Sequence, residues 1–447
     1  IGFESIRLDG RALLFTFAVT LVVGILFGLV PALRATRADL ARDLKDGSAA
    51  AGSGRRTGVS RRSLVVAEVA LALVLLAGSG LMLRSLSNLL AVDPGFDPDN
   101  LLTLRISVPG GEIAPDSLPG FYDRLQEEIA ALPGVQQVAL GNCSPLSGGC
   151  NGTIMTFADR PQQTTGNAMV GVHWVSPSWF QTLRVPLVRG RVFSETDRLD
   201  APKVVIINEE AARRYFPGED PIGKRVAVYQ GGFHTGAEVI GIVGNVRFGT
   251  IDSLPIPDVF ISHGQARRPG MMIFVRTTGD PSALVPSVRE RIRQFAPREP
   301  VYDVRPMSAR MAWATSQARF SALLLGAFAA IALALAMLGI YGVMSFAVAQ
   351  RTREIGIRMA LGADKGRVLS LVVREGTLLA GMGVAIGLVA ALMLTRVMRN
   401  LLFGVAPNDP WTYAAMIVLL AIAAFGASWI PARRAAGVDP VLALRQG

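Results

Sequence analysis

Charged and aromatic residues are scarce in this chain, and so are the residues that bind metals or form disulfides. Of its 447 residues, 18% are charged and 7% are aromatic, with two cysteines and three histidines. Ordinary soluble domains contain about 25% charged residues. The low charge content and a mean hydropathy of +0.40 therefore argue against a typical soluble enzyme and against a disordered chain. Two cysteines exclude a disulfide-rich scaffold.

Apolar residues make up 51% of the chain and are concentrated in long runs. A helix that crosses a bilayer needs about 20 consecutive apolar residues. Five stretches meet this requirement: residues 12–33, 63–83, 320–348, 368–393 and 412–430. A buried helix of a soluble protein could explain one such run, but not five. The sequence therefore predicts a multi-pass α-helical membrane protein with five transmembrane helices.

A long segment of different composition separates the second and third apolar runs. Proline, glycine and charged residues are frequent in it, and its apolar runs are short. Such runs predict strands at Leu101–Val108, Val135–Leu140, Val204–Asn208, Val239–Val243 and Met271–Arg276. Amphipathic patterns predict helices at Gly120–Leu132, Glu209–Phe216 and Ala283–Phe295. This segment is expected to be a large inserted α+β domain.

Lysine and arginine in the short loops predict the orientation, because cytoplasmic loops carry an excess of them. Basic residues are dense between residues 34 and 62, between 351 and 374, and in the C-terminal tail. The segments on the opposite side carry few, namely Arg7, Arg11, Arg396 and Arg399. We therefore expect a cytoplasmic C-terminus, with the N-terminus of this chain and the inserted domain outside. The net charge of +11 then largely reflects orientation, and no nucleic-acid partner is expected.

The two cysteines lie in the domain that is predicted to be outside. Cys143 and Cys150 flank a Ser-Pro and Gly-Gly turn, which suits a disulfide in an oxidising compartment. Two free thiols remain the alternative, because disulfide formation depends on a Cα separation that spacing does not provide. His173, His234 and His263 show no metal-ligand spacing with one another or with the cysteines. With no nucleophile motif either, we expect no catalytic residues, no metal and no cofactor.

The two ends of the chain resemble each other. VPALRATRADLARDLK at 30–45 aligns with IPARRAAGVDPVLALR at 430–445 at one fixed offset, and the match predicts an internal repeat. The first span then corresponds to the last one. Since the chain begins at Ile1 without an initiator methionine, we expect that an upstream half is missing or is supplied by another chain.

The repeat predicts how the chain is divided. Residues 1–47 are expected to be the last transmembrane helix of an upstream unit, 48–60 a flexible cytoplasmic linker, 61–92 a transmembrane helix with an outward stalk, 93–315 the external α+β domain and 316–447 a domain with three transmembrane helices.

Two charged residues lie in or beside the second span. An acid inside a membrane suggests function, but Glu68 lies close enough along the chain to Arg62 that an interfacial ion pair is an equal alternative. Arg84 is expected at the outer interface, where its long side chain can reach the headgroups.

Several segments together carry a family resemblance: RRSLVVAEVALALVLLAGSGLMLRS at 61–85, VDPGFDPDNLLTLRIS at 92–107, RRYFPGEDPIGKR at 213–225, YGVMSFAVAQRTREIGIRMALGA at 341–363 and PARRAAGVDPVLALR at 431–445. The chain resembles the FtsX/MacB type of ABC transporter permease, and specifically the duplicated orphan permeases abundant in acidobacteria. The resemblance implies a bacterial inner-membrane protein with an external domain of MacB periplasmic type. It also implies that a separate cytoplasmic ATPase drives the permease.

The charged loop after the third span matches the element that contacts the ATPase in this family. Its candidate coupling residues are Arg351, Arg353, Glu354, Gly356, Arg358 and Gly362. Apolar residues alternate with these charges, and such an amphipathic segment can lie in the headgroup region or dock into a partner groove. Simple anchoring by positive charge on the cytoplasmic side is the alternative.

The expected function is that of a permease subunit that transmits ATP-driven motion to the external domain, for export or efflux from the cell envelope. The alternative is a non-transporting sensor or regulator that controls a periplasmic partner. The resemblance implies a cytoplasmic ABC ATPase and a second permease unit as partners, the latter being the missing repeat or a second copy. It also allows a periplasmic adaptor, and the apolar spans imply contact with membrane lipids.

Overall fold

The computed structural model describes residues 10–11, 14–18, 20–21, 25, 50–108, 112–148, 150–157, 168–229, 233–351, 357 and 365–437. The chain divides into two compact units, each of them discontinuous in sequence. The first consists of Ile1–Ala72, Ala332–Gly387 and Leu419–Gly447, and the second of Leu73–Ile331 and Leu388–Val418.

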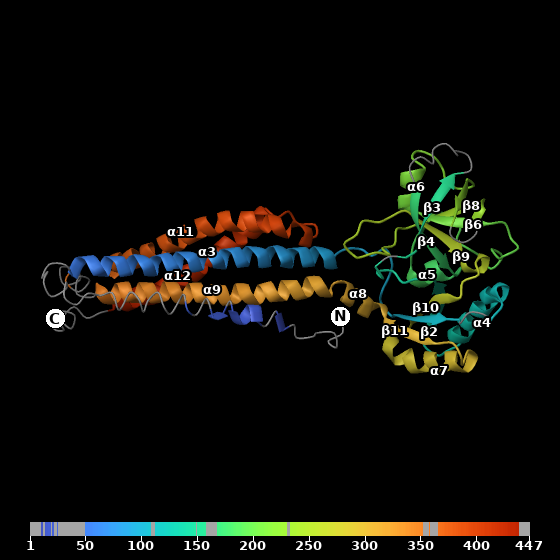
Figure 1. The fold of residues 1–447 in the computed structure, drawn as a ribbon, viewed down its shortest axis with the longest axis horizontal. Helices are drawn as coiled ribbons and strands as arrows, with labels where there is room; N and C mark the ends of the chain where they lie inside the picture. The colour runs from blue at the N-terminus through green and yellow to red at the C-terminus, as the bar shows by residue number, and fades with distance from the viewer. Residues whose placement is uncertain are drawn as a thin grey trace. The chain divides into compact units, whose positions relative to one another are not determined.

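Four described helices are long and apolar enough to cross a membrane: α3 (Ala50–Leu90), α9 (Ser316–Gln350), α11 (Lys365–Val397) and α12 (Pro410–Ala436) (Figure 1). They correspond to the second to fifth predicted spans. The first predicted span, residues 12–33, lies largely outside the described residues. The structure therefore describes four of the five predicted spans in full.

The side chains of these helices suit a lipid environment. Large apolar residues such as Leu323, Leu338 and Val397 are more than 60% exposed, which is costly in water but not in hydrocarbon. Half of the most apolar stretch of α3 is buried inside the protein, compared with 22–28% of the corresponding stretches of the other three helices. Among the four, α3 therefore has the most protein around it.

The predicted linker differs from the structure. Helix α3 begins at Ala50, so residues 50–60, which we expected to be flexible, are helical. No proline interrupts this stretch, and a helix already nucleated in the apolar run can extend backwards through it at little cost.

The described residues of the inserted domain form eleven strands and five α-helices. The strands are β1 (Leu101–Ser107), β2 (Val135–Gly141), β3 (Gly152–Phe157), β4 (Ala168–Val175), β5 (Leu187–Gly190), β6 (Val204–Asn208), β7 (Arg225–Val228), β8 (Phe233–Val243), β9 (Asp258–Ser262), β10 (Gly270–Thr277) and β11 (Val301–Pro306). The helices are α4 (Leu118–Ala130), α5 (Trp179–Leu183), α6 (Glu209–Tyr215), α7 (Val285–Phe295) and α8 (Met307–Ala314). All eight predicted strands and helices are present, with boundaries shifted by a few residues, so the expectation of an α+β domain is confirmed.

Strands β11, β1, β10 and β2 form one antiparallel part of the sheet. One face packs against α4 and α7, because alternate residues of β1 such as Leu102 and Leu104 meet Leu125 and Ile129 of α4 in one core cluster (Figure 1). Alternation of this kind lets a strand bury one face against helices. The other face packs against α5, whose Trp179 and Phe180 are buried.

The remaining strands include a closed ring. Strands β4, β3, β7, β8, β6 and β9 pair in this order, and β9 pairs back in parallel with β4. The ring meets the first part of the sheet where Gly141 of β2 pairs with Val175 of β4. The parallel pairing places Gly171 opposite Asp258 and His173 opposite Phe260.

Candidate coupling site

The candidate site lies where α9 ends and α11 begins, on the side that the charge pattern predicts to be cytoplasmic. Glu375 of α11 forms an ion pair with Arg62 of α3. Its other oxygen, Oε2, accepts a hydrogen bond from Nη1 of Arg351 at 3.2 Å, at the end of α9. One carboxylate therefore connects three helices. The two arginine side chains are 44% and 46% exposed, so solvent screens both ion pairs in part.

Further contacts of arginines with aromatic side chains support this arrangement. The guanidinium of Arg61 lies over the ring of Phe346 in α9, 4.1 Å from its centroid. Arg434 of α12 donates a hydrogen bond of 2.9 Å to the hydroxyl of Tyr341 in α9. Together with the ion pairs of Glu375, these contacts join α3, α9, α11 and α12 to one another at this end.

Of the six predicted coupling residues, Arg351 is the one that the structure places. Arg353, Glu354, Gly356, Arg358 and Gly362 lie outside the described residues. In the sequence, the segment that contains them links Arg351 to α11, the helix that carries Glu375. Sequence reasoning missed Glu375, although an acid in the first turns of an apolar helix was a usable signal.

The alternative of an ion pair between Glu68 and Arg62 is wrong, because Arg62 pairs with Glu375. Six residues along a helix correspond to a rotation of about 240°, so Glu68 and Arg62 face different directions. The Oε2 atom of Glu68 is buried and has no hydrogen-bond partner among the described residues. It lies against Gly339 of α9, where a Cβ atom would collide with the carboxylate.

At the other end of α3, Arg84 forms an ion pair with Asp409 instead of only extending towards lipid headgroups. Asp409 precedes α12 and accepts hydrogen bonds from the hydroxyl of Thr412 at 2.5 Å and from its backbone N–H at 3.0 Å. This is the geometry of a helix N-cap. The hydrogen bonds from Thr412, together with Arg84, hold the pKa of Asp409 below its usual range.

In the inserted domain, Cys143 and Cys150 are joined by a disulfide with a Cα separation of 6.3 Å. The bond closes the loop between β2 and β3. Cys143 is buried and Cys150 is half-buried.

Two family models match the chain. One, described as the MacB-like periplasmic core domain, covers residues 63–295, and the other, described as the FtsX-like permease C-terminal, covers residues 326–440. The first match alone spans more than half of the 447 residues. The first match begins inside α3 and ends with α7 at Phe295, and the second begins inside α9 and extends beyond α12.

Curated relatives include a protein described as macrolide export ATP-binding/permease protein MacB from Azoarcus sp., which is 31% identical over 63% of this chain and 42% of the relative. A pyoverdine export ATP-binding/permease protein, PvdT, from Pseudomonas syringae pv. syringae is 28% identical over 71% of this chain and 48% of the relative. The chain thus spans about half the length of these relatives.

Among solved structures, the periplasmic region of MacB from Actinobacillus actinomycetemcomitans aligns with a TM-score of 0.33 and 14% identity, over 48% of this chain and 92% of that chain. Placement in the duplicated orphan group stays a prediction. The two family models, which together cover most of the inserted domain and of the helices after it, show that the chain belongs to the family of FtsX-like permeases with a MacB-like periplasmic core domain.

Proposed function

We propose that this chain is the permease part of an ABC export system and passes the motion of a cytoplasmic ATPase to its inserted domain. The observation that carries the proposal is the position of Glu375. It connects α3, α9 and α11, and one of its two partners, Arg351, is itself a predicted coupling residue. A force on the predicted coupling loop reaches all three helices through one carboxylate.

The connectivity of the chain supports this route. Helix α3 ends at Leu90, and the inserted domain begins with β1 at Leu101. The domain ends at β11, and α8 leads directly to α9, which begins at Ser316. The two helices that meet at the ion pairs are therefore the same two that enter and leave the domain, so their movement relative to each other changes the load on it.

The relatives are described as export ATP-binding/permease proteins, and this chain aligns with less than half of each. We infer that ATP hydrolysis takes place outside the described permease, in a cytoplasmic ATPase subunit. A second permease unit, a periplasmic adaptor and an inner-membrane location with a cytoplasmic C-terminus belong to the same proposal. The divisions at residues 47, 60, 92 and 315 and the coupling roles of Arg353, Glu354, Gly356, Arg358 and Gly362 also belong to it.

The test is stimulation of a co-expressed ATPase by the full chain in proteoliposomes. Glu354→Lys and Gly356→Pro are expected to reduce stimulation at least tenfold while the protein still inserts into the membrane. Arg289→Glu, an exposed change in α7 of the inserted domain, is the matched control and leaves stimulation unchanged. Full stimulation in both loop variants would contradict the proposed coupling.

Transport distinguishes export from regulation. Loading the proteoliposomes with a macrolide or a siderophore and measuring ATP-dependent movement tests export directly. ATPase stimulation that depends on the loop but moves no substrate in any orientation would favour the sensor or regulator.

A further inference from the structure

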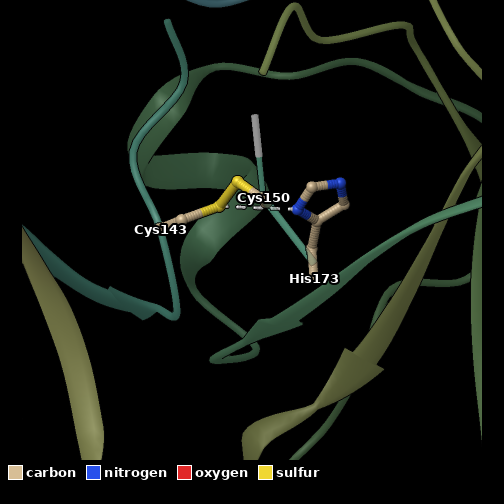
Figure 2. Close-up of side chains that lie close together, drawn as sticks. All are labelled: Cys143, Cys150 and His173. Atoms are coloured by element: carbon tan, nitrogen blue, oxygen red, sulfur yellow. Dashed lines mark hydrogen bonds between the residues drawn. A yellow bond between two sulfur atoms is a disulfide. The ribbon is translucent and has the colours of Figure 1, made fainter. Parts of the chain in front are cut away.

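The disulfide between Cys143 and Cys150 lies beside His173, a residue of strand β4. The Sγ atoms of Cys143 and Cys150 and a ring nitrogen of His173 all lie within 4.8 Å of one another. Figure 2 shows the imidazole of His173, on β4, directed at the sulfur atoms, with Nδ1 at 3.8 Å from Sγ of Cys143. Two sulfurs and one imidazole nitrogen form a donor set that zinc prefers.

The imidazole is oriented by a buried carboxylate. Nε2 of His173 lies 2.8 Å from Oδ1 of Asp258, and both residues are almost completely buried. A carboxylate oxygen accepts this hydrogen bond, so Nε2 is the donor, and in the neutral form of the ring Nδ1 presents its lone pair to the sulfurs. A disulfide sulfur has no hydrogen to donate to that lone pair. The buried Nδ1 therefore faces the sulfurs without receiving a hydrogen bond from them.

The carboxylate is itself fixed. Asn208 Nδ2 donates to Oδ2 of Asp258 at 3.3 Å, and the backbone N–H of Asp258 donates to Oδ1 of Asn208 at 2.9 Å. Phe248 stacks on the His173 ring with centroids 3.5 Å apart. Gly171 leaves room for the pair, since a Cβ atom there would collide with Oδ1 of Asp258. A carboxylate–histidine pair held in this way is how proteins orient a histidine that binds zinc.

We propose that Cys143, Cys150 and His173 form a redox-gated Zn²⁺ site, closed to metal in the disulfide form and open after reduction. A small dithiol supplies the two electrons. Its thiolate attacks one sulfur of the disulfide, its second thiol releases the mixed disulfide, and the dithiol leaves as a cyclic disulfide with both cysteines as thiols. Zn²⁺ then binds both sulfurs as thiolates, and two protons are released.

Charge and burial favour a divalent ion. Within the set of ligands, Zn²⁺ with two thiolates and a neutral imidazole has no net charge, whereas a monovalent ion would add one negative charge beside the buried carboxylate of Asp258. Three protein ligands leave one position of a tetrahedral zinc for water. Cys150 is half-buried, so a small reductant can approach the disulfide from its side.

The site is independent of the export function proposed above, and its test needs no ATPase. The full chain in detergent is reduced with a small dithiol, separated from it without oxygen, and titrated with Co²⁺ and then Zn²⁺. Because the chain has two cysteines, any thiolate-to-cobalt charge-transfer absorption reports this site alone. We expect one equivalent of metal in the reduced protein and none in the oxidised protein.

Variants separate binding from folding. Cys143→Ser and His173→Gln are expected to lower Zn²⁺ affinity at least 100-fold, and Asp258→Asn about 10- to 100-fold, in a competition with a chromophoric chelator. His263→Gln is the matched control, because His263 also lies 2.6 Å from a carboxylate, that of Asp123, but away from the sulfurs; its affinity stays unchanged. The wild-type comparison of reduced with oxidised protein requires no variant to fold. Absence of stoichiometric binding in the reduced protein, or binding that is equally tight in His173→Gln, would overturn the proposal.

Discussion

Arg62 of α3 and Glu375 of α11 form an ion pair although 313 positions separate them in the chain. Arg351 shares the same carboxylate, so the interaction belongs to a small network. Partly exposed pairs of this kind contribute about 0.2–1 kcal/mol each. Their main effect is therefore to fix the positions of α3, α9 and α11 relative to one another at this point.

We expect Arg62→Gln and Glu375→Gln to be non-additive. Glu375→Gln removes both ion pairs, and adding Arg62→Gln to it should cost little more. The double-mutant cycle, measured by thermal unfolding of the detergent-solubilised chain, should give a coupling energy of about 0.2–1 kcal/mol. Arg374→Gln, at the exposed neighbouring position, is the control. Additive effects of the two substitutions would argue against the pair.

The surroundings of Asp197 predict that the inserted domain loses stability in acid. Burial acts to raise the pKa of this carboxyl, but hydrogen bonds from Arg191 at 2.8 Å and from Ser194 outweigh it and leave the pKa below its usual range. The unfolded chain therefore binds this proton at a higher pH than the folded protein. The resulting stability is fully present above the ordinary Asp value of about 4 and is lost as the pH falls through the lower, folded value.

Asp197→Asn is expected to cost about 1–3 kcal/mol at pH 7 and to flatten the decrease in stability below about pH 4. Unfolding melts between pH 7 and pH 3, compared with wild type, measure both effects. An unchanged pH slope in the variant would assign the acid sensitivity to other carboxyls.

Gly171→Ala should destabilise the domain by about 1–3 kcal/mol, because the new methyl group would meet the carboxylate of Asp258. Gly120→Ala is the matched substitution. Gly120 lies in α4, nothing in the structure lies within 4 Å of a Cβ atom placed there, and alanine is the better helix former. Chemical denaturation of both variants should therefore show opposite signs, and equal losses would contradict the crowding at residue 171.

Arg276→Lys is expected to be far from conservative. The buried guanidinium donates to three main-chain carbonyls, those of Thr182 at 2.6 Å, Asp99 at 2.8 Å and Asp97 at 2.9 Å. A lysine ammonium is a point donor and cannot match this fork. We expect a loss of about 2–4 kcal/mol in unfolding free energy.

Arg184→Lys provides the comparison, because Arg184 pairs with Asp97 but its side chain is 62% exposed. This variant should lose less than about 1 kcal/mol of unfolding free energy. A similar loss in both arginine variants would mean that the carbonyl contacts of Arg276 contribute little.

Periodicity and composition were enough to predict the elements whose signals are local. The apolar runs became α3, α9, α11 and α12, and the strand at Val204–Asn208 was predicted to the residue. These segments are determined by their own length and apolar pattern.

Relationships between distant segments were not predictable in this way. The parallel pairing of β4 with β9 joins residues nearly ninety positions apart, and it alone brings His173 beside Asp258. His173 shows no metal-ligand spacing with the cysteines in the sequence, because the fold of the sheet, and not a local turn, brings β4 close to them. Likewise, nothing local to Arg62 identifies Glu375 as its partner.

The closed ring of β4, β3, β7, β8, β6 and β9 also affects aggregation. A sheet edge exposes unpaired backbone groups on which another chain can add a strand, and a ring has no such edge. Outside the ring, β5 pairs only with β8 and is four residues long. The path of strands ends at β11, a short strand whose Asp303 and Arg305 form an ion pair with each other and which closes with Pro306. Charge and proline at an edge discourage strand addition. The ring therefore reduces the unpaired backbone that the described part of the domain offers to a strand of a neighbouring copy.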